Sequence, residues 1–186
     1  SDLTQDMGIL DRRAKALRLD LASQVEKAVA RFGRIRSSYQ IDVGVRVPEG
    51  LLVGPMLKGE LAAILLNVLS NAIKAVIAGG GTRTVELHGF KSNRRVCLEV
   101  KDTGVGVENS EGNTLFSPLV SDPSATMYDC LEEKVASEDR FLLGQGSGLG
   151  LAIVRGIMEN RNGKVDFAEA ETGWSTCLRI ELPTPS

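Results

Sequence analysis

The 186-residue sequence predicts an α+β fold, a two-layer α/β sandwich in which a mixed sheet carries its helices on one face. Apolar patterns of helical and of strand periodicity follow one another as helix, strand, helix, two strands, long connection, helix, two strands. The hydrophobic fraction of 42% is enough for one sizeable core, and no internal repeat is visible. Helices collected on one face of a sheet bury that face, so we expect two packed layers.

The spacing of apolar residues defines the elements of the first half. Between residues 21 and 35 they recur every three or four positions, which predicts one amphipathic helix. Alternation over 41–47 predicts a strand that ends at Pro48. Residues 58–78 are the strongest helix prediction, because their apolar face is continuous and three glycines follow directly.

The second half begins with a hairpin. Alternation over 83–90 and 94–102 predicts two strands joined near Ser92 and Asn93. Residues 107–143 show little periodicity, and connections of that length are usually functional, so we expect this segment to act as a lid. A helix over 149–161 and strands over 163–169 and 175–182 complete the predicted order.

Composition bounds the class of protein. The formal net charge of −2 provides no basic field, so no nucleic-acid partner is expected. Cys97, Cys130 and Cys177 are an odd number without a CxxC pair, which argues against a disulfide framework or zinc site and suits a reducing compartment. We expect a cytoplasmic domain without direct membrane contact, since no spanning apolar run or signal peptide is visible, although a longer parent protein could be membrane-tethered.

The first group of residues that suggests chemistry is Asn67, Asn71 and Lys74. At positions i, i+4 and i+7 they share one face of the helix predicted over 58–78, opposite its apolar stripe. Two carboxamides can offer oxygen to a hard cation, and an ammonium can contact phosphate. The competing interpretation is an ordinary solvated face of an amphipathic helix.

The second group follows the strand over 94–102, where Asp102 ends the strand and Gly104 and Gly106 come next. A carboxylate there can accept hydrogen bonds from an adenine amine, and glycines let the backbone approach a planar ligand closely. An ordinary strand-end turn is the alternative, since Asp and Gly are frequent turn residues.

The third group is a glycine-rich run that leads into the helix over 149–161. Free backbone N–H groups at a helix N-terminus, together with the helix dipole, favour an anion. The run is neither a P-loop, since no Gly-Lys-Ser/Thr follows, nor a dinucleotide signature, and a flexible hinge is the alternative. Its residues are Gly144, Gln145, Gly146, Ser147, Gly148, Leu149 and Gly150.

Taken in this order, the three groups resemble the boxes of the GHKL ATPases, which share the Bergerat fold, and of the histidine kinases among them most closely. LLNVLSNAIKAV is similar to the N box of that family, DTGVGV to the G1 box, GQGSGLGLAIV to the G2 box, and residues 115–120 to the F box. The resemblance covers about 19–183. It implies a Bergerat-fold catalytic domain over 19–186, preceded over 1–18 by the tail of a helical dimerisation domain.

The resemblance implies how ATP would be held. Asp102 would recognise adenine, with Gly104, Gly106 and Thr176 close to the base. The backbone of the run over 144–150 would cradle the phosphates.

The resemblance also implies a metal and catalytic set. Asn71 would hold Mg²⁺, Asn67 and Gln145 would join it, and Lys74 would contact phosphate, so that Asn67 and Lys74 are the expected catalytic residues. Gyrase-like relatives have a general-base glutamate at the position of Asn67. An amide cannot take a proton from water, so ATP would be kept for transfer rather than hydrolysed, which argues against a conformational-clamp ATPase.

The implied reaction is transfer of the γ-phosphoryl group from Mg·ATP to a histidine on a separate helical domain of the same, homodimeric protein. A response regulator receiver domain would be the downstream partner. The single histidine of this chain, His88, lies in a predicted strand beside glycine and is interpreted as structural. An anti-sigma-type serine/threonine kinase and a nucleotide-sensing binding module of the same fold stay open as alternatives.

The segment between the G1 and G2 boxes departs from the family's pattern. It is long and carries acidic side chains, so the resemblance does not give the conformation of the lid. The acidic residues are Glu132, Glu133, Glu138 and Asp139.

Overall fold

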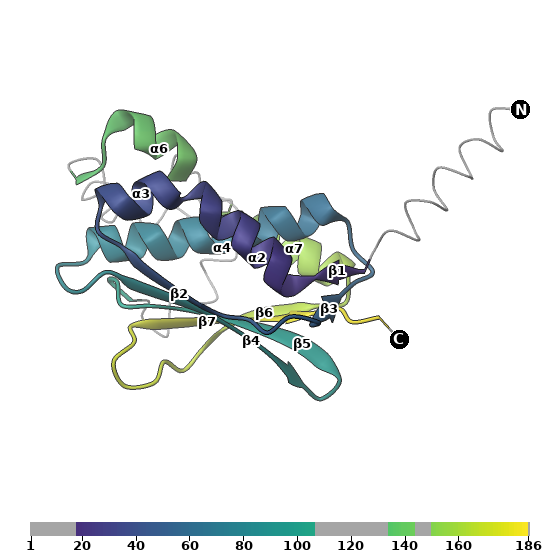
Figure 1. Ribbon diagram of the computed structural model, residues 1–186. Coiled ribbons are helices and arrows are strands. Elements are labelled where there is room, and N and C mark those ends of the chain that lie inside the picture. Colours follow the sequence, from purple (N-terminus) through teal and green to yellow (C-terminus); the bar gives the residue numbers. More distant parts are fainter. Residues whose placement is uncertain (1–17, 107–133, 144–149, 186) are drawn as a thin grey trace, which may run out of the picture.

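The computed structural model describes residues 18–106, 134–143 and 150–185 of the chain. The expected two-layer architecture is confirmed, because helices cover one face of a mixed five-stranded sheet (Figure 1).

The main sheet contains β2 (Asp42–Arg46), β4 (Thr84–Ser92), β5 (Arg95–Asp102), β7 (Thr176–Leu182) and β6 (Lys164–Ala168), in this spatial order. β2 runs parallel to β4, and every other pair of neighbouring strands is antiparallel. The register places Asp102, at the end of β5, between Val85 of β4 and Thr176 of β7. Asp102 therefore ends a central strand rather than an edge strand.

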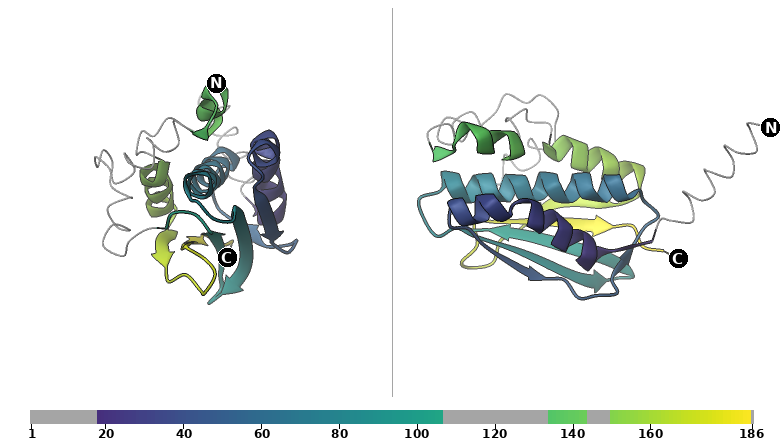
Figure 2. Two further views of the ribbon diagram at one scale, coloured as in Figure 1. Left: turned by 90° about the vertical axis from the view of Figure 1, so that its left-hand side faces the viewer. Right: turned by 45° about the horizontal axis from the view of Figure 1, so that its top comes forward.

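The helical layer contains α2 (Leu21–Arg31), α3 (Gly33–Ser38), α4 (Lys58–Ala78), α6 (Ser137–Leu143) and α7 (Gly150–Asn160). α4 is its centre, since it contacts α2, α6 and α7 as well as β4 and β5. The end-on view in Figure 2 shows α4 between α2 and α7, directly above the sheet. α4 is long and apolar enough to cross a membrane by length and composition, yet most of it is buried in this fold.

The bounds of α4 agree with the predicted helix over 58–78, and local contacts explain them. The Glu60 side chain accepts a hydrogen bond from the N–H of Leu57 at 2.7 Å, which satisfies a donor at the start of the helix. At the other end Gly79 leaves the helical conformation, with a φ of −69° and a ψ of 157°. The glycine run therefore terminates the helix as expected.

A two-stranded ribbon lies beside the main sheet. β1 (Leu19–Asp20) pairs antiparallel with β3 (Leu52–Val53). The N–H of Gly54 donates to the carbonyl of Pro183 at 2.8 Å, which joins this ribbon to the residues that follow β7. The chain therefore enters the domain at β1 and leaves it after β7 at the same end of the molecule.

Two predicted elements differ from the structure. The single helix predicted over 21–35 is two helices, because the backbone leaves the helical conformation at Phe32. Phe32 and Ile35 are both fully buried, so the break keeps the apolar side chains of both segments in the core. The irregular segment predicted over 107–143 contains the helix α6 in its last seven residues.

Candidate nucleotide-binding site

Asp102 lies at the C-terminal end of β5, beneath α4. Its side chain is only 5% exposed, and its Oδ1 accepts a hydrogen bond from the N–H of Gly104 at 2.9 Å. Burial raises the pKa of the Asp102 carboxyl to about 6, and the hydrogen bond from Gly104 offsets this in part. A desolvated carboxylate with lone pairs left over can accept hydrogen bonds from an amine of a ligand.

The turn after Asp102 packs directly on α4. A Cβ atom at Gly104 would lie 2.3 Å from the carbonyl carbon of Ala75, so no side chain fits there. The N–H of Val105 donates to the carbonyl of Ala75 at 3.3 Å. Gly106 has a φ of +77°, a conformation that favours glycine. The two glycines predicted beside a ligand therefore bring the backbone against α4 and turn it.

Thr103 anchors this turn, a role that sequence reasoning missed. Its Oγ1 accepts a hydrogen bond from the N–H of Thr84 at 3.0 Å and donates to the carbonyl of Thr82 at 2.6 Å. These bonds tie the end of β5 to the start of β4. Only the antiparallel register brings these residues together, so no local pattern could have shown the contact.

Thr176 is the residue that β7 contributes beside Asp102. It is the cross-strand partner of Asp102 and is buried, with 9% of its surface exposed. The preceding residue, Ser175, donates its N–H to the carbonyl of Asp102 at 2.9 Å. The register thus places Thr176 beside Asp102, and its expected role near the adenine stays a prediction.

Asn67 and Gly150 meet where α4 contacts the start of α7. The Asn67 Nδ2 donates to the carbonyl of Ala63 at 2.7 Å, one turn earlier in α4. The Oδ1 atom of Asn67 therefore faces Gly150, and a Cβ atom built on Gly150 would lie 2.9 Å from this oxygen. The carboxamide oxygen therefore points toward the beginning of α7, into which the glycine-rich run leads.

Asn71 and Lys74 continue the same face of α4. Asn71 is partly buried, and Lys74 is only 6% exposed. This face is therefore not a fully solvated polar stripe, which was the competing interpretation. α4 is surrounded by other elements, so Lys74 is buried and Asn67 and Asn71 are only partly exposed.

Part of the predicted site lies outside the described residues. This applies to the F-box residues 115–120, to Glu132 and Glu133, and to most of the glycine-rich run. The residues of that run are Gly144, Gln145, Gly146, Ser147, Gly148 and Leu149. The structure does place the residue before the run, because the hydroxyl of Ser70 on α4 donates to the carbonyl of Leu143 at 2.6 Å.

Asp139 joins α6 to α3 across a hundred residues of sequence. Its carboxylate is buried, accepts a hydrogen bond from the hydroxyl of Tyr39 at 2.8 Å and pairs with the guanidinium of Arg34. The same hydroxyl accepts from the N–H of Ala136 at 3.0 Å. Burial raises the pKa of Tyr39, so this hydroxyl stays protonated at neutral pH. Asp139 is thus a structural contact of α6.

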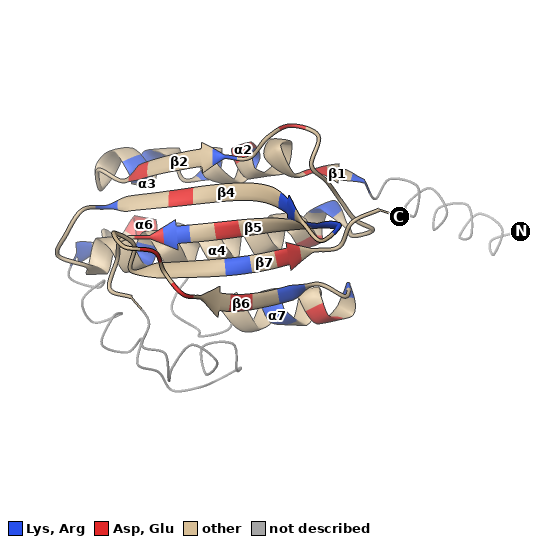
Figure 3. Ribbon diagram, turned by 90° about the horizontal axis from the view of Figure 1, so that it is seen from below, with Lys and Arg blue, Asp and Glu red and all other residues tan. Residues whose placement is uncertain are grey.

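His88 lies on the face of the sheet that carries no helices. Its neighbours Leu87 and Gly89 are buried under the helices, and side chains alternate along a strand. His88 pairs across the sheet with Glu99, and its ring centroid lies 5.1 Å from that of Phe90. Figure 3 views this face, where Lys and Arg alternate with Asp and Glu. Asp102 points to the opposite side, so His88 is a strand residue outside the site.

The described residues suit a hard cation held by amide oxygen rather than by a cluster of charged ligands. They contain no group of three His, Cys, Asp or Glu side chains that could hold a metal ion. Asn67 and Asn71 lie one turn apart on α4, and the Asn67 oxygen is turned away from its own helix. Such a pair fits Mg²⁺, which keeps several waters and takes few protein ligands.

The comparisons with known proteins point to one family. Residues 57–186 match the family described as histidine kinase-, DNA gyrase B-, and HSP90-like ATPase. The autoinducer 2 sensor kinase/phosphatase LuxQ of Vibrio harveyi is 31% identical over 126 residues, which cover 67% of this chain and 13% of that protein. The sensory histidine kinase/phosphatase NtrB of Proteus hauseri is 33% identical over 134 residues, which cover 67% of this chain and 32% of that protein.

A solved structure confirms the fold. The mycobacterial sensor histidine kinase MprB superposes with a TM-score of 0.68 and 23% sequence identity, over 91% of this chain and 99% of that chain. The chain spans a third or less of the length of LuxQ and of NtrB, so the similarity concerns one part of those longer proteins.

Proposed function

The chain belongs to the histidine kinase-, DNA gyrase B- and HSP90-like ATPase family, as the ATP-binding catalytic part of proteins of the sensor histidine kinase class, and we propose that it transfers the γ-phosphoryl group of ATP to a histidine on a separate helical domain. The observation that supports this most is the buried Asp102 carboxylate, whose following turn packs on α4 at Ala75, the residue next to Lys74. The Asp102 carboxylate suits a nucleotide base and the polar face of α4 suits a triphosphate, and β5 and α4 are neighbouring elements.

Asp102 would select adenine. Its carboxylate accepts hydrogen bonds from the exocyclic amine of the base, while Gly104 and Gly106 keep side chains out of the plane of the ring. Thr176, beside Asp102 in the register, would offer a hydroxyl to the same edge of the base.

The polar face of α4 would hold the triphosphate. Lys74 would neutralise phosphate charge, and the oxygens of Asn71 and Asn67 would hold Mg²⁺, with Gln145 as a further ligand. When bound, Mg²⁺ supplies charge neutralisation at the phosphate oxygens, which together with positioning dominates phosphoryl transfer. The residues of 144–149 and the N-terminus of α7 would cradle the phosphates.

Asn67 favours transfer over hydrolysis. Its amide nitrogen is already bound to Ala63 and its oxygen cannot accept a proton from water, so it cannot act as a general base. The acceptor would be the helical dimerisation domain of the same protein, to which residues 1–18 would connect. A homodimeric parent, a receiver-domain partner and a cytoplasmic position of this domain belong to the same proposal.

Calorimetric titration of the chain with Mg·ATP and Mg·GTP tests the proposal. We expect ATP to bind and GTP to bind about tenfold more weakly or worse, because guanine presents a carbonyl oxygen where Asp102 needs a donor. Asp102→Asn should weaken ATP binding by roughly ten- to a hundredfold. It should also reduce the preference for ATP over GTP, since an amide can donate a hydrogen bond to the guanine carbonyl. Asp42→Asn, an exposed aspartate on β2, is the matched control and should bind as the unsubstituted chain does. Equal ATP affinities for the chain and Asp102→Asn would remove Asp102 from the site.

A further inference from the structure

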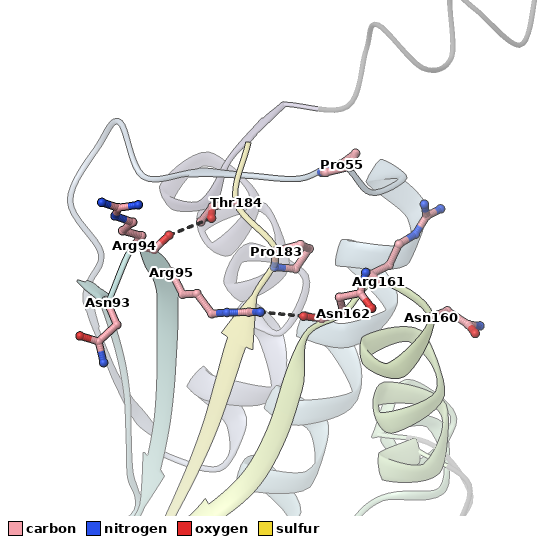
Figure 4. Close-up of a pocket in the computed structure, with 9 residues that line it drawn as sticks. All are labelled: Pro55, Asn93, Arg94, Arg95, Asn160, Arg161, Asn162, Pro183 and Thr184. Carbon is pink, nitrogen blue, oxygen red and sulfur yellow. Dashed lines mark hydrogen bonds between the residues drawn. The ribbon is translucent and has the colours of Figure 1, made fainter. Parts of the chain in front are cut away.

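A hollow of about 460 Å³ lies between the tip of the β4–β5 hairpin, the turn after α7 and the residues that follow β7. Figure 4 shows the side chains around it. Three arginines and three asparagines line it together with two prolines and a threonine, and none of the nine is acidic. The lining residues are Pro55, Asn93, Arg94, Arg95, Asn160, Arg161, Asn162, Pro183 and Thr184.

The charge of this hollow comes mainly from Arg94 and Arg95. Arg161 is neutralised, because its Nε and Nη2 donate to the carboxylate of Glu60 at 3.1 and 2.7 Å. Neither Arg94 nor Arg95 pairs with an acidic side chain among the described residues. Both residues are exposed, so they can meet an anion at little desolvation cost.

The backbone holds these two arginines in place. Asn93 and Arg94 both have a positive φ, of 48° and 64°, which makes the hairpin tip a tight two-residue turn. The Thr184 hydroxyl donates to the carbonyl of Arg94 at 2.9 Å, and Nη1 of Arg95 donates to the carbonyl of Asn162 at 2.7 Å. The tip is therefore tied both to the C-terminal residues and to the turn after α7.

The hollow is remote from the nucleotide and close to where the chain enters and leaves the domain. Arg95 begins β5 and Asp102 ends it, which separates them by roughly 23 Å of extended strand. Thr184 lines the hollow, and Pro55 follows the strand that pairs with β1. Polypeptide that continues from either end of the domain starts beside this surface.

The arrangement of the arginines favours an extended anion over a compact one. In Figure 4, Arg95 reaches across the middle of the hollow toward Asn162, while Arg94 and Arg161 lie on opposite sides of Pro183. Side chains arranged in this way match a ligand with several anionic groups along its length better than a single phosphate group. Two unpaired guanidiniums are also too few for nucleic acid, which needs many phosphate contacts, or for a membrane surface, which needs a larger basic cluster.

We propose that this hollow, named the hairpin pocket, docks an acidic protein segment whose carboxylates pair with Arg94 and Arg95. A carboxylate matches the guanidinium fork, and two carboxylates along one segment match two consecutive arginines. The asparagine side chains supply donors and acceptors for the backbone of the segment. This goes beyond the proposed function, because it concerns a surface that does not touch ATP.

The test is a titration of the isotope-labelled chain with a short peptide of Glu and Ser, and the readout is the change in the backbone amide chemical shifts. The same peptide with Gln in place of Glu, citrate, inorganic phosphate, single-stranded RNA and anionic vesicles are compared. Arg94→Gln/Arg95→Gln is the variant. Lys27→Gln/Arg31→Gln, which removes two exposed positive charges from α2, is the matched control. The single variant Arg94→Gln keeps the hydrogen bond from Arg95 to Asn162, so it tests the proposal even if the double variant disturbs the fold.

We expect salt-sensitive shifts at residues 93–95 and 160–162 with the Glu peptide and none with the Gln peptide. The double variant should weaken this binding about tenfold, with Arg94→Gln intermediate and the α2 control unchanged. Equal weakening by the α2 control, or no binding, would overturn the proposal. So would citrate, phosphate, RNA or vesicles that bind the hairpin pocket as tightly as the Glu peptide. ATP binding to the same samples is measured separately, so failure here leaves the proposed function standing.

Discussion

At the scale of single residues, Asp102 has two opposed effects. The carboxylate that would recognise adenine is buried, and burial raises its pKa to about 6. At neutral pH the nucleotide-free fold therefore keeps a desolvated negative charge. Among the described residues, only the N–H of Gly104 donates a hydrogen bond to this carboxylate. The residue that we propose to recognise adenine should thus destabilise the unliganded domain.

Asp102→Asn should therefore be more stable than the unsubstituted chain at about pH 7.5, by up to about 3 kcal/mol. The pKa is raised from 3.8 in the unfolded chain to about 6 in the folded one. The folded state therefore favours the protonated carboxyl. The stability that this protonation contributes is fully present below pH 3.8 and is lost as the pH rises through about 6. Urea unfolding near pH 4 and near pH 7.5 should show the gain of the variant only at the higher pH. A variant that is less stable at pH 7.5 would contradict this.

Gly104→Ala should destabilise the domain by about 2–4 kcal/mol, because its Cβ would overlap the backbone of Ala75, which cannot move aside. Gly156→Ala is the matched control. Gly156 lies inside α7 with nothing near its Cβ position, so alanine there should stabilise by about 0.5–1 kcal/mol. Thermal unfolding of both variants gives the comparison, and similar midpoints would show that the turn tolerates a side chain.

At the scale of elements, α4 organises the domain, and α6 depends on contacts that come from α3 and α4. Tyr39 and Arg34 hold one end of α6 through Asp139, and Ser70 holds the other end through the Leu143 carbonyl. A helix of seven residues is marginal on its own, so these tertiary contacts are what keep it folded.

Tyr39→Phe should accelerate amide hydrogen exchange in residues 136–143 by about tenfold and leave β4 and β5 unchanged. The variant removes the acceptor for the N–H of Ala136 and a donor to Asp139, a loss of about 1–1.5 kcal/mol that acts on local opening. Glu159→Gln, which breaks the exposed Arg155–Glu159 pair on α7, is the control and should change exchange little. Unaltered exchange in α6 with Tyr39→Phe would show that the contact does not hold the helix.

The sequence predicted those elements whose residues carry their own periodicity. α4 was predicted to the residue because its apolar face and the following glycines are both local signals. The ribbon of β1 and β3 was not predicted, since strands of two residues are too short to show alternation. α6 was missed for a similar reason, because its buried Asp139 has partners in α3 that no local pattern reveals.

The same limit applies to the candidate site. Motif and spacing predicted the site residues Asp102, Gly104 and Asn67. In the structure Asp102 ends β5, Gly104 follows it against α4, and Asn67 lies on α4. The supporting contacts were not predictable, namely the bond between Thr103 and Thr84 of β4, and the bond from Ser70 of α4 to Leu143 at the end of α6. These contacts depend on strand register and helix packing, which become visible only in the folded chain. The burial of Lys74 was not predictable either, because it depends on the elements that pack around α4.

At the scale of the whole molecule, the candidate functions are separated in space. The polar face of α4 and the end of β5 form the proposed nucleotide site, and the hairpin pocket lies at the end where the chain enters and leaves the domain. His88 lies on the open face of the sheet, on the opposite side from Asp102. In-line transfer requires the attacking atom within about 3–3.5 Å of phosphorus, and the proposed site places the phosphates on the opposite side of the sheet from His88.

Incubation with γ-labelled ATP, alone and with a helical phosphoacceptor domain supplied as a second protein, tests the central claim most directly. We expect no label on this chain and acid-labile label on the added domain, because the proposal assigns the accepting histidine to a separate helical domain. Asp102→Asn should slow the labelling at limiting ATP, and His88→Gln should leave it unchanged. Acid-labile label on this chain that His88→Gln abolishes would contradict the account.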